Sequence, residues 1–255
     1  MAYGFAKSEE ENVLLKVSNL SKTFSVHLLG GMTVTACQGI TFFIRAGEAL
    51  GIQGPSGSGK STILRCIYRT YLPTSGEMLY RSNRGTVDLA RIDERGVLTL
   101  RREEISYVSQ FLRVIPRVSA LDVVSQGLRR KGYVREEALN RARLLLSRLG
   151  IPPSLWSAFP STFSGGEQQR VNVARAIAAE PRLILLDEPT ASLDVDSKEM
   201  MIELLLELKA KGTALILVSH DMNALKRVSD RIFCLSKGKA QNSEEVEMEY
   251  AQVDD

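Results

Sequence analysis

Residues 54–62 read Gly54-Pro55-Ser56-Gly57-Ser58-Gly59-Lys60-Ser61-Thr62. The apolar run 49–53 precedes them, and the helix-forming stretch 63–67 follows. Three glycines let the backbone curl so that successive N–H groups point inward, and the start of a helix adds a partial positive charge. Strand, loop and helix in this order predict a phosphate-binding loop rather than an ordinary glycine-rich turn.

Two side chains of this loop carry specific chemistry. Lys60 is expected to reach the β- and γ-phosphates of a nucleoside triphosphate, and the Ser61 hydroxyl is expected to ligate Mg²⁺. The candidate ATP-binding residues are Gly54, Pro55, Ser56, Gly57, Ser58, Gly59, Lys60, Ser61 and Thr62. A nucleoside triphosphate and Mg²⁺ are therefore the predicted cofactors.

A second motif is the apolar run 183–186 followed by Asp187 and Glu188. A buried strand of a parallel sheet ends where the sheet opens onto its ligand crevice. There Asp187 can hold Mg²⁺ through its water shell, and Glu188 can polarise an attacking water. Alone, such a pair is more often a helix cap or a solvated turn, but beside a phosphate-binding loop it favours an active site.

A third motif begins a predicted helix at Ser164-Gly165-Gly166-Glu167. Ser164 is a natural N-cap, and the two glycines leave the first N–H groups of the helix accessible to a phosphate. By itself this pattern favours an ordinary capped helix.

The rest of the chain alternates short β-branched runs with amphipathic stretches, which is typical of an α/β fold with a mainly parallel sheet covered by helices. Expected strands are 13–17, 33–45, 49–53, 105–108, 183–187, 214–219 and 231–235, the first two in an antiparallel flank. Helical periodicity predicts an inserted helical subdomain over 113–180. We expect one domain over 1–255, with a core of 13–112 and 181–240 and an acidic, mobile tail over 241–255.

Two other segments are interpreted as scaffold or connection. The stretch 197–211 is expected to be a helix whose apolar stripe, which includes Met201, Leu204 and Leu205, faces the core. Residues 81–102 mix charges with glycine, and we expect an elaborated hairpin or loop there.

Composition excludes several classes of function. The 33 basic and 30 acidic residues give a net charge of only +3, and the basic residues are scattered, so direct nucleic-acid binding is not expected. Apolar runs such as 183–186 and 214–218 are far shorter than the roughly 18 residues that span a bilayer. No direct membrane insertion and a cytoplasmic location are expected. The three cysteines show neither metal-ligand spacing nor a redox pair, which predicts reduced thiols.

In this order and spacing, the three motifs resemble the ATP-binding cassette (ABC) family over residues 14–238, with the fold of its nucleotide-binding domain: a P-loop NTPase core with a parallel sheet, an antiparallel β flank and an inserted helical subdomain. The family resemblance implies that the triphosphate is ATP. It implies that Gln110 touches Mg²⁺ or the attacking water, that Asp194 in 191–194 couples two active sites, and that His220 senses the γ-phosphate. It also implies that Phe24 stacks on adenine, although Phe is usually a core residue. Phe163 and Glu167 replace the usual leucine and glutamine of the family signature.

In this family the signature residues complete the active site of a second subunit. The resemblance therefore implies that Ser164, Gly165, Gly166 and Glu167 act in trans, with two ATP molecules sandwiched in a dimer. The partner would be a second copy of the chain or a related ABC ATPase subunit. Hydrolysis through Glu188 would open the dimer and drive a conformational change in a further partner.

Residues 71–73, 109–124 and 160–174 resemble the ATP-binding subunits of the bacterial carbon-phosphorus lyase (phosphonate) system. The first two stretches are not required by ATP chemistry, and 111–115 adds apolar residues and an arginine in the region that contacts the partner in cassette proteins. This resemblance implies that the partner is the carbon-phosphorus lyase core complex. Two alternatives stay open: an energising subunit of a membrane exporter or lipoprotein-release system, and a nucleotide-gated clamp that barely hydrolyses ATP.

Overall fold

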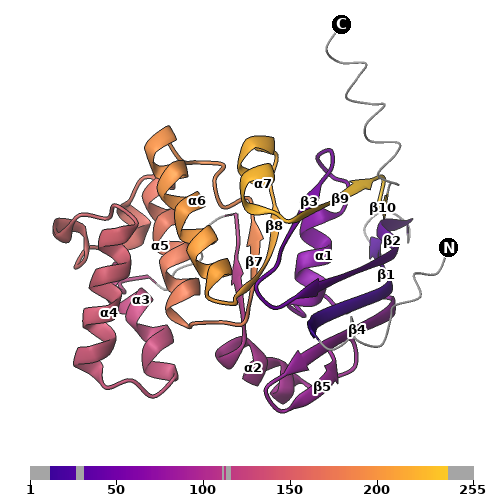
Figure 1. Ribbon diagram of the computed structural model, residues 1–255, viewed down its shortest axis with the longest axis horizontal. Helices are drawn as coiled ribbons and strands as arrows, with labels where there is room; N and C mark the ends of the chain where they lie inside the picture. The colour runs from indigo at the N-terminus through magenta and orange to yellow at the C-terminus, as the bar shows by residue number, and fades with distance from the viewer. Residues whose placement is uncertain (1–11, 27–31, 111, 113–115, 241–255) are drawn as a thin grey trace, which may run out of the picture.

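The computed structural model describes residues 12–26, 32–110, 112 and 116–240, which form two β-sheets with helices around them (Figure 1). In these ranges the larger sheet has six strands in the order β10-β9-β3-β8-β7-β6, and every pair except β10–β9 is parallel. Its strands are β3 (Ala49–Gln53), β6 (Ile105–Val108), β7 (Leu183–Asp187), β8 (Ala214–Val218), β9 (Arg231–Ser236) and β10 (Lys239–Ala240). β7 and β8 are buried along their whole length, as continuous apolar runs predict.

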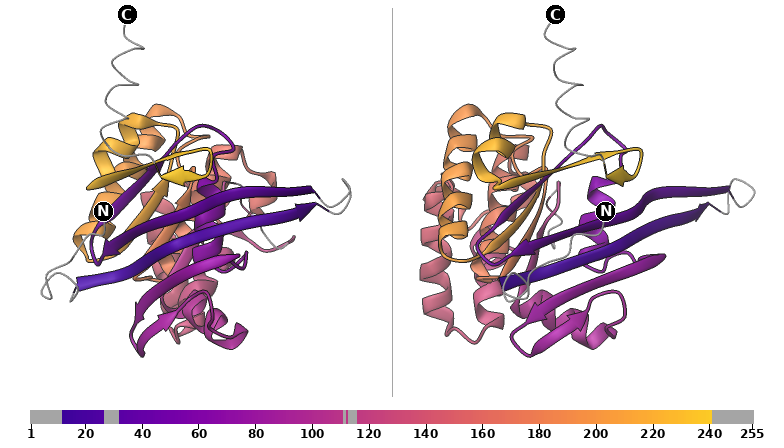
Figure 2. Two further views of the ribbon diagram at one scale, coloured as in Figure 1. Left: turned by 90° about the vertical axis from the view of Figure 1, so that its right-hand side faces the viewer. Right: turned by 45° about the vertical axis from the view of Figure 1, so that its right-hand side comes forward.

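The second sheet is antiparallel and has, within the described ranges, the order β2-β1-β4-β5. Its strands are β1 (Val13–Val26), β2 (Met32–Arg45), β4 (Ser75–Ser82) and β5 (Gly85–Asp88). The predicted antiparallel flank is confirmed. However, β1 extends to Val26 rather than ending at Val17, because register shifts on either side of Leu20 let the pairing with β2 continue through the polar middle of the strand. β1 and β2 form the long ribbon in Figure 2.

The segment 81–102 is only partly the predicted loop. A hairpin turn joins β4 to β5, but residues Glu94–Glu103 form helix α2. The Asp93 side chain caps this helix by accepting a hydrogen bond from the Gly96 N–H, and Val97 and Leu100 are its buried residues. The hairpin is confirmed, but helix α2 was not predicted, because its narrow apolar stripe lies among charged residues.

The helical layer predicted between β6 and β7 is present. Its helices are α3 (Ala120–Arg130), α4 (Arg135–Arg148) and α5 (Gly165–Ala178), with short 3₁₀ turns at Pro153–Leu155 and Pro160–Thr162. The remaining helices are α1 (Lys60–Ile67), α6 (Val195–Ala210) and α7 (Met222–Val228). In α6 the stripe of Met201, Leu204 and Leu205 is buried, as expected of scaffold. Residues 111 and 113–115 of the predicted partner-facing run, and the predicted tail 241–255, lie outside the described residues.

Alternate residues of β7 divide the core into two clusters. Leu183 and Leu185 pack in one cluster with the buried residues of α1, whereas Ile184 and Leu186 pack in the other with the buried residues of α5. Because successive strand side chains point to opposite faces, α1 and α5 cover opposite faces of the six-stranded sheet. In Figure 1 these two helices lie on either side of β7.

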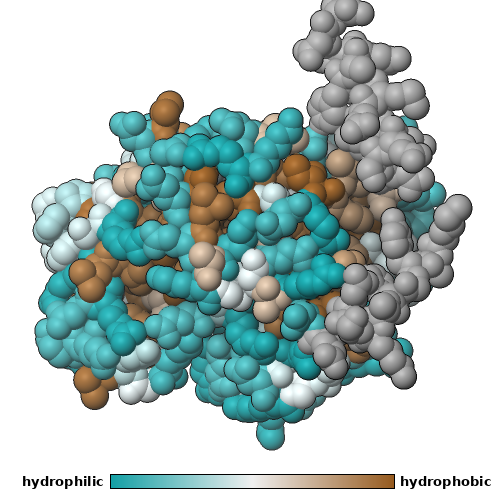
Figure 3. Space-filling view, viewed as in Figure 1, coloured by the Kyte–Doolittle hydropathy of each residue, from teal (hydrophilic) through white to brown (hydrophobic). Residues whose placement is uncertain are grey.

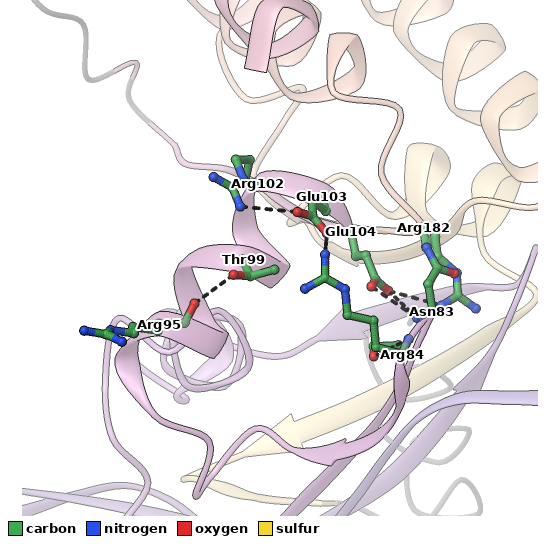
Figure 4. A network of polar contacts seen from close by, with 9 residues as sticks. Asn83, Arg84, Arg95, Thr99, Arg102, Glu103, Glu104 and Arg182 are labelled. Carbon is green, nitrogen blue, oxygen red and sulfur yellow. Dashed lines mark hydrogen bonds and ion pairs between the residues drawn. The ribbon is translucent and has the colours of Figure 1, made fainter. Parts of the chain in front are cut away.

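A buried carboxylate joins the two sheets. Glu104, 3% exposed, accepts hydrogen bonds from the Tyr80 hydroxyl of β4 (3.2 Å), from the Asn83 N–H (3.1 Å) and from the Arg182 guanidinium (3.2 Å) before β7. Figure 4 shows Asn83 and Arg182 converging on Glu104. Burial and the neighbouring Glu104 charge raise the pKa of Tyr80, so its hydroxyl remains a donor. Glu104 therefore fixes the antiparallel sheet against the parallel one.

The surface and the cysteines of the described residues match what the composition predicts. Among the described helices, none has the length and hydropathy to cross a bilayer, and hydrophilic side chains cover most of the face in Figure 3. Cys37 and Cys66 are buried and Cys234 is half-buried, all as free thiols.

Candidate nucleotide-binding site

The ends of four parallel strands bring the predicted site residues to one edge of the sheet. Ile52 pairs with Val218, Asp187 with Val218 and Val108 with Leu186, so β3, β8, β7 and β6 end nearly level. The segments that follow these strands carry the phosphate-binding loop, His220, Glu188 and Gln110. Ligands of open α/β sheets bind at this edge.

The loop between β3 and α1 has a backbone that requires glycine at two positions. Gly54 and Gly59 have φ of 154° and 100°. A Cβ atom at Gly54 would lie 2.1 Å from the Leu235 carbonyl oxygen, and one at Gly59 would lie 2.1 Å from the Ala36 carbonyl oxygen. The loop is thus packed against β9 and β2, and its curl directs it to the N-terminus of α1, which favours anions.

Lys60 lies at the start of α1 and is only 6% exposed. Its ammonium group donates to the carbonyl oxygens of Gly54 (2.7 Å) and Pro55 (2.8 Å). Burial lowers the pKa of Lys60, while the charges of Glu188 and Asp187 oppose that effect. An ammonium has three donors, so Lys60 can brace the loop and still offer one donor to a phosphate.

Asp187 has a hydroxyl donor on each carboxylate oxygen. The Ser61 hydroxyl donates to Oδ1 at 2.8 Å, and the Tyr107 hydroxyl donates to Oδ2 at 2.8 Å. Within the described residues no group of three or more His, Cys, Asp or Glu side chains forms a metal site alone. Mg²⁺ commonly takes one or two protein oxygens and completes its shell with water and substrate phosphates. The Ser61–Asp187 pair fits that requirement.

Glu188 follows β7 with a φ of 55°, a conformation that residues other than glycine adopt at a cost and that clusters at functional sites. Its carboxylate lies 3.4 Å from His220 Nε2 and accepts a hydrogen bond from the His220 N–H at 3.3 Å. Burial raises the pKa of Glu188, with the His220 N–H and the charges of His220 and Lys60 opposing it. A half-buried carboxylate of raised pKa is suited to accept a proton from water.

Two further predicted site residues lie just beyond β6 and on β1. Gln110 is exposed, two positions beyond β6. Phe24 lies on β1, where its ring meets Tyr71 edge-on at 5.1 Å and the Lys22 ammonium lies 4.8 Å from its centroid. The stacking of Phe24 on adenine stays a prediction.

The signature motif forms the predicted cap of α5. The Ser164 hydroxyl accepts from the Glu167 N–H (3.3 Å), and the Glu167 carboxylate accepts from the Ser164 N–H (2.8 Å), which together make a capping box. Hydrogen bonds from Ser164 lower the pKa of Glu167. Glu167 therefore has a clear local role in place of the usual glutamine.

The signature also packs against the predicted coupling segment 191–194. A Cβ atom at Gly166 would lie 2.9 Å from the Ser192 carbonyl oxygen. Arg170 of α5 donates to Ser197 (2.5 Å) and lies 3.9 Å from Asp194, which caps α6. The two motifs form one unit on the α5 side of the sheet, away from α1.

Sequence reasoning did not identify Tyr107. The available signal was weak: Tyr107 is one of two hydroxyl side chains in the four-residue strand β6, which neighbours β7.

The raised pKa of Glu188 predicts a pH-dependent stability. A carboxyl with a raised folded pKa contributes stability that is present below its unfolded pKa and lost as the pH rises through its folded pKa. Glu188→Gln keeps the shape of the side chain without its charge. The unfolding free energy of the variant minus that of wild type should therefore increase as the pH rises from about 4 to about 7. Urea denaturation without nucleotide measures this difference.

Glu199→Gln is the matched control, because Arg227 lowers the pKa of Glu199 and the linkage has the opposite sign. That variant should lose stability relative to wild type over the same pH range. A pH-independent difference between Glu188→Gln and wild type would contradict a raised pKa.

Comparison with known proteins agrees with this geometry. The family described as ABC transporter matches residues 37–191. The probable amino-acid ABC transporter ATP-binding protein of Haemophilus influenzae is 38% identical over 232 residues, 88% of this chain and 85% of that protein. The glutamine transport ATP-binding protein GlnQ of Escherichia coli is 35% identical over 227 residues, 89% of each.

Solved structures show the same fold. The dimeric bacterial ABC transporter cassette MJ0796 has a TM-score of 0.83 and 33% identity, over 89% of this chain and 97% of that chain. A dimeric post-hydrolysis state of MJ0796 bound to ADP and Pi has a TM-score of 0.82 at the same identity and coverage. The chain therefore belongs to the ABC transporter family, and it is an ATP-binding cassette that hydrolyses Mg-ATP.

Proposed function

We propose that two copies of this cassette, or one copy and a related cassette, close around two ATP molecules and drive a conformational change in a partner. The observation that carries this proposal is the placement of α1 and α5 on opposite faces of the six-stranded sheet. The loop that leads into α1 and the Ser164 cap of α5 are both suited to phosphate, yet they belong to different faces of one chain. A second copy would bring its own Ser164 to the Lys60 loop.

Within each site the residues would divide the work as follows. Lys60 and the loop N–H groups bind the phosphates, while Ser61 and Asp187 hold Mg²⁺, partly through water. When bound, Mg²⁺ would neutralise charge on the phosphate oxygens. Glu188 would orient and deprotonate the attacking water. His220, whose N–H and ring both contact Glu188, would contact the γ-phosphate.

The remaining predicted residues would link the sites to the rest of the assembly. Gln110 would follow the metal or the attacking water from the end of β6. Asp194 would report the state of one site to the other, because it is adjacent to the signature helix through Arg170. Loss of the γ-phosphate would remove the contacts that bridge two copies and open the dimer.

For the partner, the favoured candidate is the carbon-phosphorus lyase core complex of phosphonate utilisation. It is supported by the resemblance of residues 71–73, 109–124 and 160–174 to the ATP-binding subunits of that system. Two of these stretches are in contact, since the Asn172 side chain donates to the Ser109 carbonyl oxygen at 2.8 Å. A partner that docks beside Gln110 would thus act on the helix that begins at Ser164. In this reading the cassette works in the cytoplasm.

A membrane transporter is the second candidate. The observation in its favour is the identity of 38% and 35% to proteins named as amino-acid and glutamine transport ATP-binding proteins. An exporter or a lipoprotein-release system would use the same nucleotide chemistry. In either case the cassette would energise a transmembrane permease rather than a lyase.

The dimer proposal predicts opposite behaviour for two variants. Glu188→Gln should slow turnover by roughly 10²- to 10⁴-fold while it still binds ATP, because only the base is lost. It should sediment as a dimer in Mg-ATP, and adding Ser164→Arg should return it to monomer. Monomer in Mg-ATP for Glu188→Gln alone would contradict the sandwich, and unchanged turnover would remove Glu188 from the mechanism.

Affinity purification separates the two partners. Glu188→Gln, tagged and held in Mg-ATP, should recover carbon-phosphorus lyase core subunits without detergent from cells grown on phosphonate as the phosphorus source. The control is the same tagged protein with Ser164→Arg added: because this variant is expected not to dimerise, it shows whether recovery of the partner depends on the closed dimer. Recovery of a transmembrane permease in detergent instead would contradict the lyase assignment and support the transporter.

A further inference from the structure

Tyr107 shares Asp187 with Ser61 but lies outside the motifs that identify the site. It belongs to β6, the strand that pairs with β7 on the side away from β8. Its hydroxyl donates to Asp187 Oδ2 at 2.8 Å, while the Ser61 hydroxyl donates to Oδ1 at the same distance. Asp187 is 2% exposed, and its carboxylate is held from two sides.

The Tyr107 ring is held by residues of α1 and of the turn after it, and a residue of α2 supports one of them. It stacks on Tyr68, which follows α1, at 5.2 Å between centroids and 25° between planes. The Arg65 guanidinium interacts with the Tyr107 hydroxyl and donates to the Tyr71 hydroxyl at 3.1 Å. Arg101 of α2 lies over the Tyr68 ring, with its guanidinium 4.4 Å from the ring centroid. These contacts prevent the Tyr107 hydroxyl from following a rotation of Asp187.

We propose that Tyr107 is a positioning residue that fixes the Asp187 carboxylate in the orientation that Mg²⁺ requires. This inference rests on the proposed metal-binding role of Asp187. Partners that hydrogen-bond a ligating carboxylate set its orientation, and their loss typically weakens metal binding by about 10- to 100-fold. With a donor on each oxygen, Asp187 cannot turn its plane, and its remaining lone pairs stay directed toward the nucleotide side of β7.

The test uses Mn²⁺ as a paramagnetic probe of the metal site. Full-length Tyr107→Phe with bound ADP should bind Mn²⁺ about 10-fold more weakly than wild type in an electron paramagnetic resonance titration. Its affinity for ADP in EDTA should stay within about twofold, because Tyr107 touches only the metal ligand in this scheme. In turnover assays the half-saturating Mg²⁺ concentration should rise while kcat at saturating Mg²⁺ is retained.

Tyr80→Phe is the matched control. It also removes one tyrosine hydroxyl from a buried carboxylate, that of Glu104, at the joint between the sheets and away from Asp187. Mn²⁺ affinity should not change in Tyr80→Phe. Equal weakening in both variants would show a general loss of packing and would overturn the positioning role.

Asp187→Asn distinguishes the metal-binding role of Asp187 from the positioning role of Tyr107. Weak Mn²⁺ binding in Asp187→Asn with normal binding in Tyr107→Phe overturns the inference and leaves the proposed function intact. Normal binding in Asp187→Asn overturns the metal-binding role itself. If Tyr107→Phe does not fold, Arg65→Met replaces it: removal of the group beside the hydroxyl should weaken Mn²⁺ binding by about 3-fold, and unchanged affinity overturns the proposal.

Discussion

The hydrogen-bonded register of β3, β8, β7 and β6 is the constraint on which the site depends. Ile52 and Asp187 both pair with Val218, so the phosphate-binding loop and the acidic pair emerge at one level. A slip of one residue in β7 would turn Asp187 to the opposite face of the sheet. The fully buried side chains of β7 and β8 specify this register on both faces, and the chemistry at the strand ends follows from it.

In the proposed function, the two faces of the sheet account for a single chain that holds parts of two sites. The α1 face carries the loop, the proposed metal ligand and the proposed base, whereas the α5 face carries Ser164 and the segment that ends at Asp194. Bonds from Asn172 to Ser109 and from Arg170 to Ser197 cross from α5 to the segments that flank the site. In this proposal the phosphate chemistry takes place on one face, and partner contact and dimer closure involve the other.

The sequence predicts those parts of the site that depend on the backbone. Gly54 and Gly59 were predictable because only glycine tolerates such close approaches, and Ser164 because a serine before two glycines is a strong cap. Helix α2 and the full length of β1 were not, because their apolar patterns are interrupted by charge and by register shifts. Tyr107 could not be inferred, since its contact with Asp187 depends on which strand neighbours β7.

The most direct test of a site shared between copies mixes two variants expected to be inactive, Lys60→Ala and Ser164→Ala. Ser164→Ala removes the hydroxyl without the bulk that is expected to block dimerisation. In a mixed dimer, Lys60 of one copy faces Ser164 of the other, so one complete site is restored. Equal amounts of the two variants should therefore recover about a quarter of wild-type ATP hydrolysis. If mixing restores no hydrolysis, Lys60 and Ser164 act within one chain or not at all, and the account of a site completed in trans is contradicted.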